Sequence, residues 1–169
     1  MKKILICVLS LSLLLASLTG CGLLDKFIIP EEQVYTFGRF SITLPSDFVS
    51  EQRSLIGGST EVFYSNDYSI KVQKYSFDSI TPKDGYDFPA LAQFASDMLG
   101  LGEEPLLVLN DKGVLGYDYI DENGNNAQLL VFLESDDAYW FISFFSSTVD
   151  YETAKVEYLK WIDTISFGE

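Results

Sequence analysis

The chain has 169 residues, with 11 basic and 25 acidic side chains and a formal net charge of −14. An acidic surface repels nucleic acid, so nucleic acid is not expected as a partner. The sequence has no histidine and only two cysteines. This composition excludes Ser-His-Asp and Cys-His catalysis and removes the usual ligands of zinc, copper and haem, so no cofactor is expected.

The first 20 residues have the organisation of a secretory signal peptide. Lys2 and Lys3 form a positively charged N-terminal region, and an almost wholly apolar run follows from Ile4 to Leu18. That run is shorter than the roughly 20 residues that a membrane-spanning helix needs. An ordinary signal peptide cut at another site and an uncleaved membrane anchor remain as alternatives.

The segment Leu18-Thr19-Gly20-Cys21 resembles the lipobox of bacterial lipoproteins. The resemblance implies cleavage between Gly20 and Cys21 and a diacylglyceryl group on the Cys21 thiol. Two acyl chains, such as palmitate, hold a protein stably on a bilayer, whereas one chain binds only marginally. We therefore expect a lipid-anchored protein on the extracytoplasmic face of a bacterial membrane.

The lipidated cysteine and a short tether are expected to occupy residues 21–33, and the folded domain residues 34–169. Two short strands are predicted at 34–37 and 40–44, separated by Gly38-Arg39 and ended by Pro45. Residues 46–58 are polar and end in two glycines, so they are predicted to form a loop.

A hairpin is predicted from 61–64 and 68–77, because Tyr68, Ile70 and Val72 alternate with polar residues. A loop is expected at 78–87. A helix then follows, with Asp87 as its N-cap and Pro89 in its first turn. Glycines 100 and 102 are expected to end it.

Further strands are predicted at 105–110, 114–121, 127–134 and 139–146. The last two are apolar on both faces, so both faces must be covered. A second helix at about 150–164 would supply part of the cover through one apolar stripe. The stripe consists of Tyr151, Ala154, Tyr158, Trp161, Ile162 and Ile165.

These elements predict an α+β domain with one antiparallel sheet of about six to eight strands and helices packed on it. Three segments resemble PsbP-like domains, which also occur in DcrB-type bacterial lipoproteins. The resemblance implies an α/β/α sandwich and a role in binding or assembly rather than an enzyme. The segments are Phe40–Phe48, Tyr139–Phe144 and the closing helix with Thr164–Phe167.

One turn has the oxygen spacing of a calcium-binding loop. Asp121, Asn123 and Asn125 match the first ligand positions of an EF-hand. However, Asn126 stands where that loop needs glycine, and Phe132 stands where it needs glutamate. A hairpin turn containing Asn-Gly is the favoured interpretation, and no metal is expected.

Other groups of residues give weaker evidence of a catalytic or binding site. A serine could pair with a lysine base, two adjacent acidic pairs or two strand carboxylates could act in hydrolysis, and four aromatic residues could line a groove. For the aromatic residues, packing in the core is favoured. The candidate lysine bases are Lys71, Lys74, Lys155 and Lys160. The adjacent acidic pairs are Glu103-Glu104 and Asp136-Asp137, and the strand carboxylates are Asp118 and Glu134. The aromatic residues are Tyr117, Tyr119, Tyr139 and Phe141.

The sequence thus favours a non-catalytic binding or assembly module, with an envelope protein or a small ligand as partner. An enzyme of unfamiliar carboxylate chemistry and a calcium-dependent module are the alternatives. An exposed aromatic patch or an uncovered sheet edge would favour a protein partner. A pocket with converging carboxylates of raised pKa would favour an enzyme.

Overall fold

The computed structural model describes residues 31–55, 58–78, 88–102, 106–121 and 126–168. All of them from Glu32 onward belong to one compact unit, Glu32–Glu169. The expected signal peptide with Gly20 and Cys21, and the predicted N-cap Asp87, lie outside the described residues. Glu103-Glu104, Asn123 and Asn125 lie outside them as well.

Most of the described strands form a seven-stranded antiparallel sheet, in the order β3-β4-β5-β9-β8-β7-β6. The two long central strands, β5 and β9, pair along their whole length, from Tyr68 opposite Ser146 to Ser76 opposite Ala138. The strands are β3 (Val49–Leu55), β4 (Gly58–Tyr64), β5 (Tyr68–Ser76), β6 (Leu107–Val108), β7 (Leu115–Ile120), β8 (Ala127–Ser135) and β9 (Ala138–Ser146).

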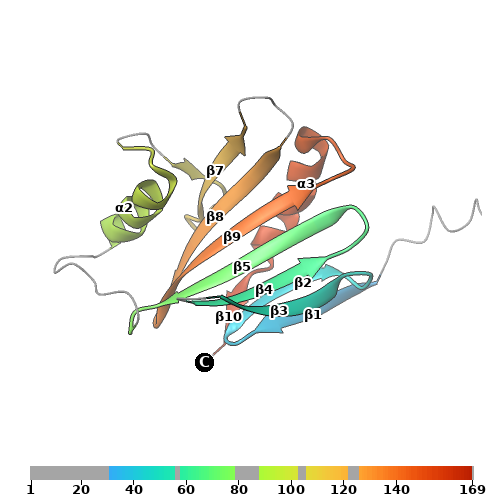
Figure 1. The fold of residues 1–169 in the computed structure, drawn as a ribbon, viewed down its shortest axis with the longest axis horizontal. Coiled ribbons are helices and arrows are strands. Elements are labelled where there is room, and N and C mark those ends of the chain that lie inside the picture. The colour runs from blue at the N-terminus through green and yellow to red at the C-terminus, as the bar shows by residue number, and fades with distance from the viewer. Residues whose placement is uncertain (1–30, 56–57, 79–87, 103–105, 122–125, 169) are drawn as a thin grey trace, which may run out of the picture. The chain divides into compact units, whose positions relative to one another are not determined.

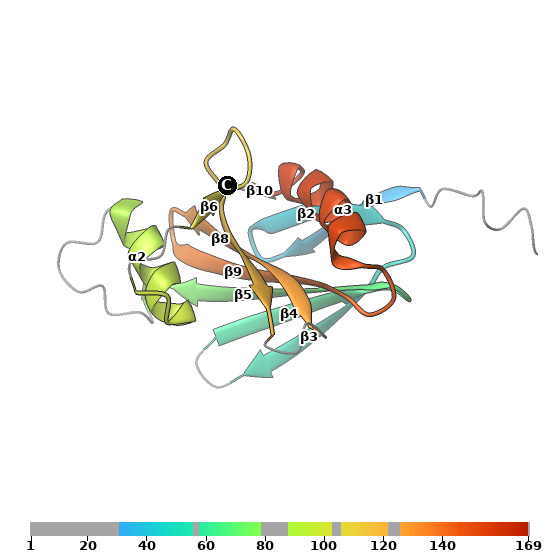
Figure 2. The same ribbon diagram turned by 90° about the horizontal axis from the view of Figure 1, so that it is seen from above.

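A smaller sheet has three strands in the order β1-β2-β10. It consists of β1 (Glu32–Phe37), β2 (Phe40–Pro45) and β10 (Ser166–Phe167). The tight turn between β1 and β2 needs Gly38, whose φ of +59° is costly for other residues. The small sheet and the helix α3 (Tyr151–Asp163) lie on the same side of the large sheet (Figure 2).

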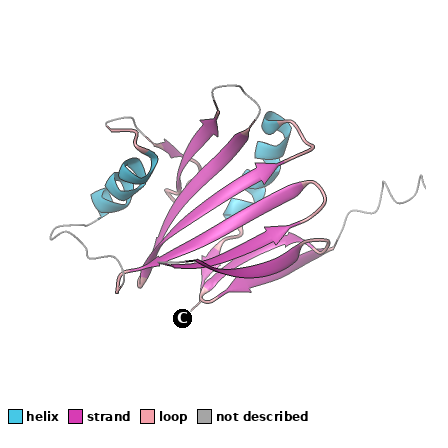
Figure 3. Ribbon diagram, viewed as in Figure 1, coloured by secondary structure: helices cyan, strands magenta, loops and turns pink. Residues whose placement is uncertain are grey.

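The core has two parts, one on each face of the large sheet. On the face toward the small sheet and α3, Val131, Trp140 and Ile142 are fully or almost fully buried. On the other face, Phe132 and Tyr139 pack against the helix α2 (Phe88–Leu99). The prediction that β8 and β9 are covered on both faces is therefore confirmed, with the two helices at different ends of the sheet (Figures 1 and 3).

Both predicted helices are confirmed, and so is the glycine signal at the end of α2. The carboxylate of Asp150 accepts a hydrogen bond from the backbone N of Thr153 at 3.1 Å and so caps α3. Gly100, with a φ of +69°, follows the end of α2. The predicted apolar stripe of α3 is buried at Ala154, Tyr158, Trp161 and Ile162.

The predicted loop at 46–58 is wrong, because residues Val49–Leu55 form strand β3. Its sequence, VSEQRSL, lacks the alternation that marks a half-buried strand. β3 lies at one end of the sheet order and pairs with β4 along its whole length, from Val49 opposite Tyr64 to Leu55 opposite Gly58. Backbone hydrogen bonds to one neighbour therefore hold this edge strand in place.

The predicted fold class is confirmed: antiparallel sheets and packed helices form an α+β domain. The expectation of one sheet needs correction, because the strands divide into sheets of seven and three. The third strand of the small sheet, β10, has two residues and is too short to give a pattern.

Candidate functional site

The turn proposed as a weak calcium site is closed by its own side chains. The amide of Asn126 donates to a carboxylate oxygen of Asp121 at 2.7 Å. The backbone N of Asp121 also donates to the carbonyl oxygen of Asn126 at 2.9 Å. These two bonds join the ends of β7 and β8 as a hairpin turn does. Among the described residues, no three histidine, cysteine, aspartate or glutamate side chains gather closely enough to hold a metal ion.

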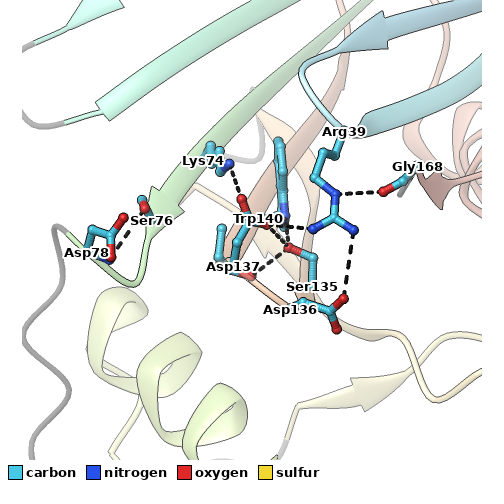
Figure 4. A network of polar contacts seen from close by, with 10 residues as sticks. Arg39, Lys74, Ser76, Asp78, Ser135, Asp136, Asp137, Trp140 and Gly168 are labelled. Atoms are coloured by element: carbon cyan, nitrogen blue, oxygen red, sulfur yellow. Dashed lines mark hydrogen bonds and ion pairs between the residues drawn. The ribbon is translucent and has the colours of Figure 1, made fainter.

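The acidic pair Asp136-Asp137 lies in the turn between β8 and β9 and belongs to a polar network (Figure 4). Lys74 donates to Asp137 at 2.5 Å, and the hydroxyl of Ser135 donates to the same carboxylate at 2.8 Å. Arg39 lies 3.8 Å from Asp136 and 3.9 Å from Asp137. The carboxylates are held by cations from β5 and the β1–β2 turn, an arrangement that fastens the two sheets together.

The electrostatics of this network differ from those of a catalytic acid. Hydrogen bonds from Lys74 and then Ser135 hold the pKa of Asp137 below its usual value. A general acid in glycoside hydrolysis needs the opposite shift and a second carboxyl group facing it. The network therefore lacks the features of a general acid site.

The four candidate lysine bases are spread over the domain, and three of them pair with carboxylates. Lys74 contacts Asp137, Lys155 contacts Asp118, and Lys160 contacts Glu157. The fourth, Lys71, lies directly opposite Ser143 in the register of β5 and β9. The hydroxyl of Ser143 donates to Oε1 of Gln128 at 2.6 Å. The Ser143 proton is thus already committed to an amide oxygen.

Three of the four candidate groove aromatics pack in the core, as favoured from the sequence. Tyr139 is buried, and Tyr117 and Phe141 are partly buried against the same cluster below α2. Tyr119 differs, because 43% of its surface is exposed. It lies toward the other end of β7, away from the helix.

Tyr119 lies on the same face of the large sheet as α2, but toward the other end of that face. It belongs there to a row of cross-strand neighbours. Side chains directly opposite one another in an antiparallel sheet lie on the same face. The register therefore places six residues in this row, which we call the open face: Val49, Tyr64, Ser69, Phe145, Gln128 and Tyr119.

The open face is accessible to solvent. Val49 is 53% exposed, Tyr64 40% and Tyr119 43%, and the other three members are partly exposed. The next row contains Glu51, Val62 and Lys71, which lie opposite one another. Aromatic side chains are enriched at protein contact surfaces whereas lysine and glutamate are depleted there, so the open face resembles such a surface more than this next row does.

The open face continues to a sheet edge. β3 lies at one end of the strand order, and its residues Val49 to Gln52 are all exposed. The backbone of an edge strand can pair with a strand from another chain. Sequence patterns missed this surface, since Val49 and Phe145 are nearly 100 positions apart and only the register brings them into one row.

Comparison with known proteins bears on the fold alone. No protein-family model matches the chain, and no curated protein matches it. The solution structure of cyanobacterial PsbP (CyanoP) from Synechocystis sp. PCC 6803 is similar to this structure, with a TM-score of 0.51 and 14% identity. The match covers 88% of this chain and 95% of CyanoP.

A crystal structure from Bacteroides thetaiotaomicron VPI-5482 is similar to the same degree, with a TM-score of 0.51 and 14% identity. That match covers 84% of this chain but only 50% of the other chain. The predicted PsbP-like fold is therefore confirmed. Among the described helices, none is long and apolar enough to cross a membrane.

Proposed function

We propose that this protein is a lipid-anchored, extracytoplasmic binding module that holds a protein partner of the bacterial envelope through its open face. The anchor is the diacylglyceryl group expected on Cys21. The observation that carries the binding role is the row from Val49 to Tyr119, in which two tyrosines and a valine are exposed beside an available strand edge.

Tyrosine supports such a role for physical reasons. A tyrosine ring offers a large apolar area with a polar tip, and its few rotatable bonds lose little entropy on binding. Tyr64 and Tyr119 lie at different positions of one row across the sheet, and Phe145 lies between them. A partner strand or helix laid along the row would contact all three rings.

The tether limits where the partner can be. The chain extends at most about 3.5 Å per residue, so the stretch from Cys21 to β1 spans no more than roughly 40 Å. A partner of the anchored domain would thus lie at or close to the membrane surface. The acidic surface of the domain, with its net charge of −14, favours a partner with a basic contact face.

Photo-crosslinking from defined positions tests the proposal. A photoreactive amino acid at position 64 or 119 should capture the same envelope protein in intact cells. Position 156 on α3 is the matched control, because Val156 is 54% exposed but outside the open face. The captured protein, once purified, should bind the wild-type chain and fail to bind the Tyr64→Lys, Tyr119→Lys double variant. Equal capture at position 156, or unchanged binding by the double variant, would refute the proposal.

A further inference from the structure

Strand β3 forms one outer edge of the large sheet (Figure 2). It has seven residues, and among the described strands it pairs with β4 alone. Its residues Val49 to Gln52 are exposed. An edge strand presents backbone N–H and C=O groups that can pair with a strand from another molecule, so this edge is a candidate interface.

β3 lacks two of the features that usually protect a sheet edge. Its sequence, VSEQRSL, contains no proline, and its register with β4 runs from end to end without a bulge. Charged side chains also protect edges, because most partner strands leave them unmatched. β3 carries two charged residues of opposite sign, Glu51 and Arg53. A partner strand must therefore present the opposite charges at the matching positions.

The sequence of β3 meets this requirement by itself when it is read in the antiparallel direction. With the Gln52 residues of two copies opposite each other, every position of β3 meets a residue of matching type: apolar with apolar, serine with serine, and acid with base. The opposed pairs are Val49 with Leu55, Ser50 with Ser54, Glu51 with Arg53, and Gln52 with Gln52. Opposite charges at directly opposed positions stabilise a pair of antiparallel strands.

The two charges also disfavour the neighbouring registers. A shift by one residue would flip every side chain of one strand to the other face of the sheet. A shift by two residues keeps the faces but places Glu51 opposite Glu51, or Arg53 opposite Arg53, and like charges directly opposite are destabilising. A parallel pairing in register brings the same like charges side by side. The sequence of β3 thus specifies one antiparallel register, centred on Gln52.

The net charge of −14 opposes the association of two copies, but it acts over distances that salt screens. At physiological ionic strength the interaction between exposed charges decays over about 8 Å. Directly opposed side chains in a sheet have Cβ atoms only about 5 Å apart. Salt therefore weakens the overall repulsion more than the attraction between Glu51 and Arg53 of the second copy.

We propose that two copies of this protein associate edge to edge through β3 and form one continuous antiparallel sheet. Such an interface is two-fold symmetric, with the same surface used by both copies. The two-fold axis is perpendicular to the sheet, so both small sheets lie on one side of it and both open faces on the other. Both β1 strands, which follow the expected tethers, then lie on the same side, as two anchors in one bilayer require. The dimer goes beyond the proposed function, because it needs neither the envelope partner nor the open face.

Charge exchange tests the dimer by analytical ultracentrifugation of the full-length protein in detergent at high micromolar concentration. Glu51→Arg and Arg53→Glu each place like charges opposite one another in both charged pairs, so each should weaken dimerisation by about tenfold or more. The double variant restores the complementary charges and should dimerise like wild type. Glu51→Arg also lowers the net negative charge, so general repulsion alone would predict tighter association of that variant.

A mixture of the two single variants supplies a second measurement. Each variant presents the charges that the other needs, so the mixture should form a heterodimer although each variant alone is largely monomeric. Recovery of the heterodimer also shows that both variants are folded. A mixture as monomeric as its components would contradict the assigned register.

Disulfide formation locates the contact. Directly opposed residues in antiparallel strands have Cα atoms about 4.5–5.5 Å apart, which a disulfide can bridge. Gln52→Cys should therefore give a covalent dimer under mild oxidation. Val108→Cys is the matched control, because Val108 is 68% exposed on β6, at the other edge of the sheet. Wild-type protein that stays monomeric, a single charge variant that dimerises as tightly as wild type, or equal crosslinking at position 108 would overturn the proposal.

Discussion

Lys155 on α3 and Asp118 on β7 form an ion pair, with 2.6 Å between Nζ and Oδ2. Tyr151, one turn earlier on the helix, donates its hydroxyl to the other oxygen of the same carboxylate. One strand carboxylate thus fixes the first turns of α3 against the large sheet. The side chains of Lys155 and Asp118 are only 23% and 30% exposed, so water screens their attraction less than at an open surface.

Asp118→Ala should therefore lower the free energy of unfolding by about 2 kcal/mol, because two partly buried donors lose their acceptor. Glu157→Ala is the matched control, since it breaks the more exposed pair with Lys160 on the same helix. Its expected cost is below about 0.5 kcal/mol. Urea unfolding followed by tryptophan fluorescence measures both, and equal losses would contradict this account.

Gly116→Ala tests a close approach between β7 and the chain after β6. A Cβ on Gly116 would lie 2.4 Å from Cδ1 of Leu109, and Cγ would be only 2.8 Å away. The leucine side chain must shift, and such overpacking costs about 1–3 kcal/mol. Urea unfolding should show this loss in the wild-type background. In a Leu109→Ala background the same substitution should cost much less, and an unchanged cost would exclude the clash.

The network around Asp137 predicts a dependence of stability on pH. The pKa of Asp137 is lower in the folded chain than in the unfolded chain, chiefly because of Lys74. Its contribution is therefore complete above the unfolded value of about 4 and is lost as pH falls through the folded value. Asp137→Asn should unfold more easily than wild type at pH 7, by less than about 1 kcal/mol, since the side chain is 39% exposed.

The difference between wild type and Asp137→Asn should narrow as the pH falls below about 4. Thermal unfolding at a series of pH values measures it. Asp136→Asn serves as control, because this neighbour contacts only the margin of the network, 3.8 Å from Arg39. If the stability difference between wild type and Asp137→Asn instead grew as the pH fell, the pKa of Asp137 would not be lowered by folding.

Cys21→Ser tests the anchor. Growth with an alkyne-tagged palmitate should label the wild-type protein and leave this variant unlabelled, and the variant should leave the membrane fraction. Cys7→Ser is the control, since Cys7 lies within the expected signal peptide and should not carry lipid in the mature chain. A label that persists on Cys21→Ser would place the lipid elsewhere.

Strong local patterns predicted much of the fold. The stripe from Ala154 to Ile162 follows helical spacing, and β8 and β9 contain the apolar runs Leu129–Leu133 and Tyr139–Ile142, so burial dictated both patterns. Gly100 marked the end of α2 because its positive φ suits few other residues. In each of these elements the local sequence and the tertiary packing favour the same structure.

What escaped prediction depends on partners distant in the sequence. β3 is polar and exists because β4 offers it a backbone ladder. The open face follows from the register of β3, β4, β5, β9, β8 and β7, which no local window contains.

The small sheet sets an order of assembly for the whole domain. Strand β2 gains its second neighbour from β10, and Thr43 bonds to Thr164 across 121 positions while Arg39 bonds to Gly168 across 129. Every strand of the large sheet must therefore leave the ribosome before β2 can be paired on both of its edges. A chain interrupted before residue 164 would leave Phe40 without Phe167, its ring partner from β10. We expect such a chain to expose more apolar surface, and hence to be cut by proteases more readily, than a chain made through β10.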